Sequence, residues 1–208
     1  MGDLQLLVFL ATSLVIIAAP GQDMVLVMSR SIAHGARAGV ATAAGVSVGL
    51  LGHTLLAALG LGAALRASEA LFLGLKLAGA AYLVYLGAKL LLARRAELAL
   101  AGAGERPARG LFLQGALSNL SNPKVALFYF AFLPQFVPAG SAHPTAALAA
   151  LGAAFAALTF LVKGPVGFFA GRLSAWLRAR PQALVWLHRT SGMVLIGLGL
   201  RLALERRG

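Results

Sequence analysis

The stretch Pro20-Gly21-Gln22-Asp23 interrupts the first long apolar segment of the chain, and Asn122-Pro123-Lys124 interrupts the fourth. Each motif places helix-breaking residues and a charge inside a segment that is otherwise apolar enough to cross a bilayer. Hydrocarbon cannot satisfy the backbone N–H and C=O groups that such a break leaves free. Broken helices therefore persist in membranes where they line a cavity or meet a polar ligand.

The composition of the chain is that of a membrane protein. Its 208 residues are 60% hydrophobic and only 12% charged, whereas a soluble domain is about half apolar and about a quarter charged. The net charge of +12 comes from residues that lie mainly between the apolar segments rather than on one basic face, which argues against nucleic-acid binding. The chain has no cysteine, and this excludes disulfides, thiolate metal ligands and a membrane thiol–disulfide conductor.

The apolar pattern predicts six membrane-spanning helices, each compared with the about 20 residues that a bilayer requires. The fifth span carries Lys163-Gly164-Pro165 near its end, and a connecting loop follows it. Five spans with a last helix that lies on the membrane surface is the alternative. The predicted spans are Leu4–Met28, Ala38–Leu65, Ala70–Leu92, Gly110–Val137, Thr145–Ala170 and Leu184–Leu204.

The spacing of the two interruptions suggests an internal repeat. They lie about half the chain length apart, so that two related three-helix halves would each supply one broken helix to a shared polar site. Residues 1–92 would form the first repeat and residues 110–208 the second. Residues 93–109, in which charges alternate with Gly and Pro, would form a cytoplasmic linker. The predicted fold is an all-α membrane protein of six helices in two inverted repeats, with helices 1 and 4 broken.

The distribution of arginine predicts the orientation in the membrane. Ten arginines lie in or next to the connections after the first, third and fifth predicted spans, counting Arg189 near the start of the sixth span, and four are counted on the other side. The side with more positive charge faces the cytoplasm. Both termini are therefore expected outside, and the two halves would be inserted with opposite topology.

Two charges lie where an apolar span should carry none. Asp23 is the only acidic residue within a predicted span, and a carboxylate there requires a partner, a cavity or a function; the alternative is a helix cap near the cytoplasmic surface. Lys124 follows Pro123 at the start of a resumed helix, where free N–H groups and the helix dipole favour an anion. The alternative for Lys124 is an ammonium that reaches the interface, as expected for Lys163 near its span end.

Together the two breaks define a dipolar site that is complementary to an α-amino-acid zwitterion. Asp23 and Lys124 could also pair with each other, with substrate or protons competing for the pair. Gln22 and Asn119 are neutral hydrogen-bonding residues nearby. His53, midway along the second span, is either a proton relay or a hydrogen-bonded packing residue. Asp23 and His53 are therefore the candidates for proton coupling.

Three motifs jointly resemble those of the LysE/RhtB family of amino-acid exporters. They are Pro20–Asp23 with Ser29-Arg30-Ser31 and Gly35–Gly39, then Gly79–Gly87, and finally Asn119–Lys124 with Phe132–Phe136. The resemblance covers nearly the whole chain in order, and it implies proton-motive-force-driven efflux of amino acids or derivatives such as homoserine, threonine, leucine or lysine. Gln22 departs from the pattern, because many members have a second proline there. The residues that match the membrane motifs of the family are Pro20, Gly21, Asp23, Asn119, Asn122, Pro123 and Lys124.

The sequence thus predicts a multi-pass protein of the bacterial cytoplasmic (inner) membrane that exports neutral, zwitterionic amino acids or derivatives in a proton-coupled reaction. Its expected partners are the amino acid, protons and the lipid bilayer, and a homo-oligomer is a possible further assembly. No enzymatic activity, cofactor, metal or nucleic acid is expected. The alternatives are a cation or metal exporter of the same superfamily, for which one Asp and one His make a poor site, and a passive solute channel. The predicted substrate-binding residues are Pro20, Gly21, Gln22, Asp23, Asn119, Asn122, Pro123 and Lys124.

Overall fold

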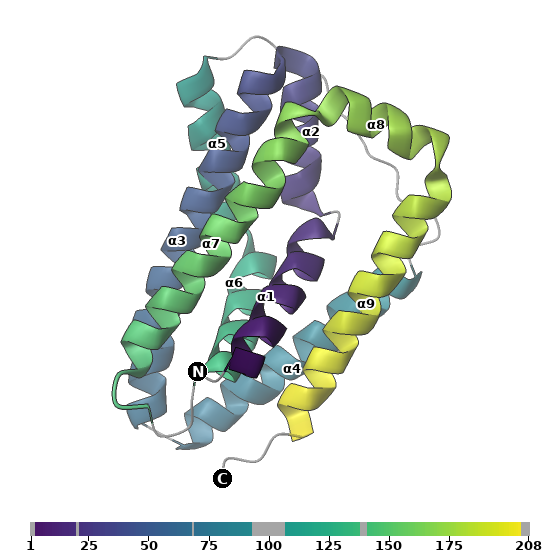
Figure 1. Ribbon diagram of the computed structural model, residues 1–208. Coiled ribbons are helices and arrows are strands. Elements are labelled where there is room, and N and C mark those ends of the chain that lie inside the picture. The colour runs from purple at the N-terminus through teal and green to yellow at the C-terminus, as the bar shows by residue number, and fades with distance from the viewer. Residues whose placement is uncertain (1–2, 20, 68, 93–106, 138–140, 205–208) are drawn as a thin grey trace.

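The computed structural model describes residues 3–19, 21–67, 69–92, 107–137 and 141–204, and every secondary-structure element in these ranges is a helix (Figure 1). In Figure 1, α3, α5 and α7 form one side of the bundle, α4 and α9 form the other, and α1 and α6 lie between them. The elements are α1 (Asp3–Ala18), α2 (Gln22–His34), α3 (Ala36–Ala67), α4 (Glu69–Leu92), α5 (Ala108–Leu120), α6 (Pro123–Phe132), the 3-10 helix η1 (Leu133–Phe136), α7 (Pro144–Phe168), α8 (Ala170–Ala179) and α9 (Pro181–Leu204).

The helices have the length and surface of membrane spans. Within the described ranges, α3 (over Ala36–Gly60) and α7 are each long and apolar enough to cross a bilayer, and α1 with α2 passes the same test as a pair bent by 55°. Large apolar side chains face outward, among them Leu55 at 60% and Leu161 at 66% exposure, as a lipid-facing surface requires. The all-helical membrane fold is confirmed, whereas the six-span inverted repeat stays a prediction.

Both predicted interruptions are breaks between helices. Gly21 has extended backbone (φ −146°, ψ −173°) and precedes the first residue of α2. At the second break, α5 ends at Leu120 and α6 begins at Pro123, because proline is favoured at the first position of a helix, where its missing N–H costs no hydrogen bond. The carbonyl of Asn122 accepts the first bond of α6, from the Val125 N–H at 3.0 Å.

The connection between the fifth and sixth predicted spans contains a helix that the sequence analysis did not predict. This helix, α8, crosses one end of the bundle between α7 and α9 (Figure 1). Ala170 and Ser174 are buried, while Trp176 is exposed and lies under the guanidinium of Arg180 at 5.3 Å from the ring centre. A short helix with a basic and aromatic outer face suits the membrane–water interface.

An aromatic column holds α6 in the middle of the bundle. Phe128, Phe132 and Phe136 follow one another at intervals of four residues, with ring centres 5.0 and 4.9 Å apart. Phe9 of α1 lies 5.2 Å from Phe136, and Phe155 of α7 lies 5.6 Å from Phe128. Rings at such distances pack favourably in edge and offset arrangements, so the column fixes α6 against α1 and α7.

Glycines make several close seams between helices, and two of these seams lie on opposite sides of the bundle. A Cβ atom on Gly45 of α3 would contact the backbone of α5, and one on Gly49 would lie 2.7 Å from the carbonyl oxygen of Ala116. On the other side of the bundle, Gly87 of α4 and Gly192 of α9 face each other, and a Cβ on either would lie within 2.7 Å of the other's carbonyl oxygen. Small residues at such seams let helices approach where no hydrophobic effect separates helix from lipid.

The seam between α3 and α5 is expected to depend on the missing side chain of Gly45. Gly45→Ala should destabilise the protein by about 1–3 kcal/mol, because a new methyl group meets backbone that cannot move aside. Gly74→Ala is the matched control, since no atom lies within 4 Å of its added Cβ, and alanine favours a helix interior. The check is the temperature at which each purified variant loses its monodisperse peak in detergent. Equal midpoints for the two variants would contradict the role of the seam.

Candidate functional site

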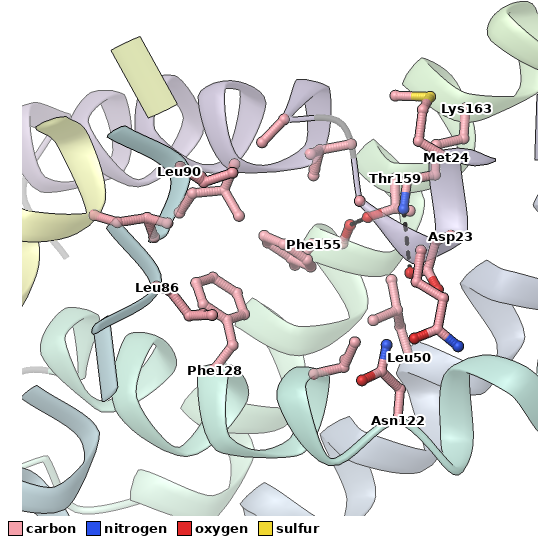
Figure 2. A pocket seen from close by; sticks show the side chains of 17 residues that line it. Asp23, Met24, Leu50, Leu86, Leu90, Asn122, Phe128, Phe155, Thr159 and Lys163 are labelled. Atoms are coloured by element: carbon pink, nitrogen blue, oxygen red, sulfur yellow. Dashed lines mark hydrogen bonds and ion pairs between the residues drawn. The ribbon is translucent and has the colours of Figure 1, made fainter. Parts of the chain in front are cut away.

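A cavity of about 130 Å³ lies at the two helix breaks. Helices from both sides of the bundle line it, together with α1, the start of α2 and the start of α6. Figure 2 shows that its two ends differ: Asp23, Thr159 and Lys163 gather at one end, and Leu86 and Leu90 lie at the other. A cavity of this size is large enough for several water molecules or a small solute.

Asp23 of α2 contacts residues of α5 and α7 at the polar end of the cavity. It lies in the first turn of α2, and its Oδ2 atom accepts a hydrogen bond from Asn119 Nδ2 at 2.9 Å and an ion-pair contact from Lys163 Nζ at 3.2 Å. The side chains of Lys163 and Asp23 are only 10% and 12% exposed. Removing either charge would take from the other its ion-pair partner among the described residues, and a buried charge that loses its partner is strongly unfavourable.

The same carboxylate also has an unused acceptor. Asp23 Oδ1 is buried, and no residue in the described part of the chain donates a hydrogen bond to it. A buried oxygen without a donor costs about 1–3 kcal/mol, so the site is set to receive a donor from water or from a ligand. Because Asp23 lines the cavity, a solute in the cavity can supply that donor.

His53 satisfies the backbone at the second break. Pro123 has no N–H, so the carbonyl of Asn119 loses the donor that lies four residues ahead in a continuous helix. The Asn122 N–H at 2.9 Å and His53 Nε2 at 3.0 Å take its place. Since a carbonyl oxygen only accepts, His53 carries its hydrogen on Nε2. His53 is buried and is not among the lining residues of the cavity, so its part in proton coupling stays a prediction.

Two helix N-termini meet at the cavity. Gly21 precedes α2 and Asn122 precedes α6, and both residues line the cavity wall. The first N–H groups of a helix have no acceptor within the helix, and the helix dipole places partial positive charge there. Together with the ammonium of Lys163, these termini make the polar end attractive to a carboxylate.

The structure brings most of the predicted site residues together. Asn119 lies outside the lining but binds Asp23. Pro20 and the side chains of Pro123 and Lys124 lie outside the described residues, so the pairing of Asp23 with Lys124 stays a prediction. The predicted residues that line the cavity are Gly21, Gln22, Asp23 and Asn122.

Lys163 is a candidate site residue that the sequence pattern did not predict. Its position near the end of the fifth predicted span suggested an ammonium that reaches the interface, but the structure buries it against Asp23. The available signal was Gly164-Pro165 directly after it, since this combination of a charge with helix breakers also marks the other two motifs. Thr159, one turn earlier on α7, lines the cavity as well, and its hydroxyl donates to the Phe155 carbonyl at 2.8 Å.

Comparison with known proteins places the chain in a family. It is 33% identical over 199 residues to the homoserine/homoserine lactone efflux protein of Salmonella typhimurium, covering 95% of each chain. It is 28% identical over 203 residues to the leucine efflux protein of Klebsiella pneumoniae, covering 97% of this chain and 96% of the relative. An uncharacterized membrane protein of Pseudomonas aeruginosa is 34% identical over 193 residues, 90% of this chain and 89% of the relative.

No solved structure matches the chain. Residues 14–206 match the family described as LysE type translocator. The breadth of this match agrees with the resemblance of the three sequence motifs to the same family. The chain therefore belongs to the LysE family and is a multi-pass membrane transporter.

Proposed function

We propose that this protein exports neutral amino acids across the bacterial inner membrane in exchange for protons. The observation that carries the proposal is the pair of Asp23 and Lys163 at the polar end of the cavity, where no described residue donates to the second carboxylate oxygen of Asp23. Two relatives named as efflux proteins for homoserine or its lactone and for leucine support an amino-acid substrate. Both of these names denote small solutes without a net charge on the side chain.

The charges of the site suit a zwitterion. The α-ammonium group of a substrate would donate to Asp23 Oδ1, and its carboxylate would contact Lys163 and the N-termini of α2 and α6. Lys124, in the first turn of α6, is expected to add to this positive potential. Asp23 is the only acidic residue among the described lining residues, so a cationic side chain would find no second carboxylate there.

Competition at Asp23 offers a simple route to proton coupling. The carboxylate can bind a proton, the Lys163 ammonium or the substrate ammonium, and a protonated Asp23 no longer attracts a cation. Occupancy by proton and by substrate would therefore be mutually exclusive, as exchange across a membrane requires. In this proposal Asp23 carries the proton, and His53 supports the helix break.

We also propose the inverted-repeat organisation, with repeats at residues 1–92 and 110–208 and a cytoplasmic linker at 93–109. The packing supports it, because elements that would be equivalent in the two halves contact each other: α3 packs on α7, and α4 packs on α9. In addition, each half begins with a broken helix, as in transporters built from inverted repeats. Residues 93–106 lie outside the described residues, so the linker is proposed from sequence.

The natural lack of cysteine allows a direct test of the topology. Ala101→Cys in the linker should be protected from a membrane-impermeant maleimide in intact cells and labelled after permeabilisation. Ala142→Cys, which is exposed before α7, should be labelled in intact cells, because an odd number of spans separates the two positions. Labelling of both variants from the same side would contradict the six-span arrangement.

Efflux is expected to require Asp23 and Lys163. Asp23→Asn and Lys163→Ala should each reduce amino-acid accumulation in inverted membrane vesicles to background, because each removes one pole of the site, and Lys124→Ala should lower it as well. Lys89→Ala is the matched control, since Lys89 is exposed in the last turn of α4, and it should transport normally.

A double variant separates function from folding. Either single substitution at the ion pair leaves an unpaired buried group and is expected to lower stability by about 3–5 kcal/mol. Asp23→Asn combined with Lys163→Met removes both charges, so it should regain much of the stability without regaining transport. Transport by the double variant at the unmodified rate would refute the assignment of this pair to the substrate site.

Proton coupling is tested by an imposed pH gradient. With an acidic interior, inverted vesicles should accumulate labelled amino acid above the external concentration, and a proton ionophore should abolish the accumulation. His53→Gln should keep the coupling, because a glutamine amide can still donate to the Asn119 carbonyl. Equilibration to the same level with and without the gradient is the behaviour of a passive channel and would overturn the exchange mechanism.

A further inference from the structure

We infer that the end of the cavity opposite Asp23 selects the substrate's side chain, and that it takes hydrophobic side chains of about the size of leucine. This inference rests on the proposed function, since it assumes that the α-amino and α-carboxylate groups bind at Asp23 and Lys163. It adds a second, apolar subsite and the residues that would determine specificity there.

The two subsites lie at opposite ends of one cavity. Figure 2 shows Leu86 and Leu90 across the open space from Asp23 and Lys163, with Phe155 between the two ends. Leu86 is 6% exposed and Phe155 is 4% exposed. A zwitterion anchored at Asp23 would therefore direct its side chain toward the leucines of α4.

Among the residues that the structure describes, those labelled at the apolar end in Figure 2 carry no polar side chain. Phe128 lies beside Leu86 at this end (Figure 2), and the lining residues that α1 and α9 contribute to the cavity, Ile16, Ile17 and Leu195, are aliphatic. A hydroxyl or ammonium group placed among them would lose its hydrogen bonds to water without replacement. Homoserine and lysine should accordingly bind less well than leucine or methionine.

The wall of this subsite is firmly packed, so it also limits size. The ring of Phe128 lies 5.0 Å from that of Phe132 and 5.6 Å from that of Phe155, which places it in the aromatic column that holds α6. Rings packed in this way cannot change rotamer to admit a bulky substrate without a large cost in packing energy. The volume of about 130 Å³ therefore favours a side chain of moderate size over an indole.

The first test measures selectivity in the unmodified protein. Purified protein in liposomes would be given labelled leucine with a pH gradient, and unlabelled leucine, methionine, homoserine, lysine or tryptophan would compete. Leucine and methionine should inhibit at concentrations at least about tenfold lower than homoserine, lysine or tryptophan, since one apolar contact of this kind is worth about ten- to two-hundredfold. Equal inhibition by leucine and homoserine would overturn the inference.

The second test changes the wall itself. Leu86→Thr places a hydroxyl at the apolar end and should shift the leucine-to-homoserine preference toward homoserine by about tenfold. Leu77→Thr is the matched control on the same helix, because Leu77 is 48% exposed and is not a lining residue; its preference should not change. An unchanged preference in Leu86→Thr would overturn the role of this wall.

The outcomes distinguish the inference from the proposed function. Gradient-driven transport of homoserine or lysine with no preference for leucine would refute the apolar subsite and leave amino-acid export standing. Failure to transport any of the five amino acids, with protein that is monodisperse and correctly inserted, would refute both.

Discussion

The shared carboxylate of Asp23 is the interaction on which the site depends. One oxygen joins three segments that are far apart in sequence: the first turn of α2, the end of α5 through Asn119, and α7 through Lys163. In hydrocarbon surroundings none of these groups can turn to bulk water, so each depends on the others for a partner. The two helix breaks lie next to this cluster, which satisfies polar groups that lipid cannot.

The backbone of the second break receives a hydrogen bond from a residue that does not line the cavity. His53 donates to the carbonyl that Pro123 leaves without its usual donor, and Gly49 lets Asn119 lie close to α3, with the amide oxygen 3.0 Å from where a Cβ would stand. The side-chain nitrogen of Asn119 in turn donates to Asp23. The break is thus stabilised by a residue that does not line the cavity.

The sequence was sufficient to predict the all-helical fold and the two breaks, because a charge or a proline stands out against an apolar background; the roles of Asp23 and Asn119 stay predictions. It could not show which cation would reach Asp23. Lys163 is five residues from the end of α7, and from hydropathy alone such a lysine is expected to extend toward water; only the packing of α7 beside α2 places it in the interior. Helix α8 was missed for a similar reason, since its basic residues resemble those of a loop until their spacing on a helix is known.

The two glycine seams have a mechanical consequence. Two helices whose backbones are in direct contact cannot slide past each other without losing that contact. We therefore expect α3 and α5 to move together as one unit, and α4 and α9 as another. The cavity takes Leu50 from the first unit and Leu86 and Leu195 from the second, with α1 and α6 between them. A solute that contacts both units would stabilise the conformation in which the two units lie close together around it. In the proposed exchange, opening toward either face of the membrane would then require one unit to rock against the other.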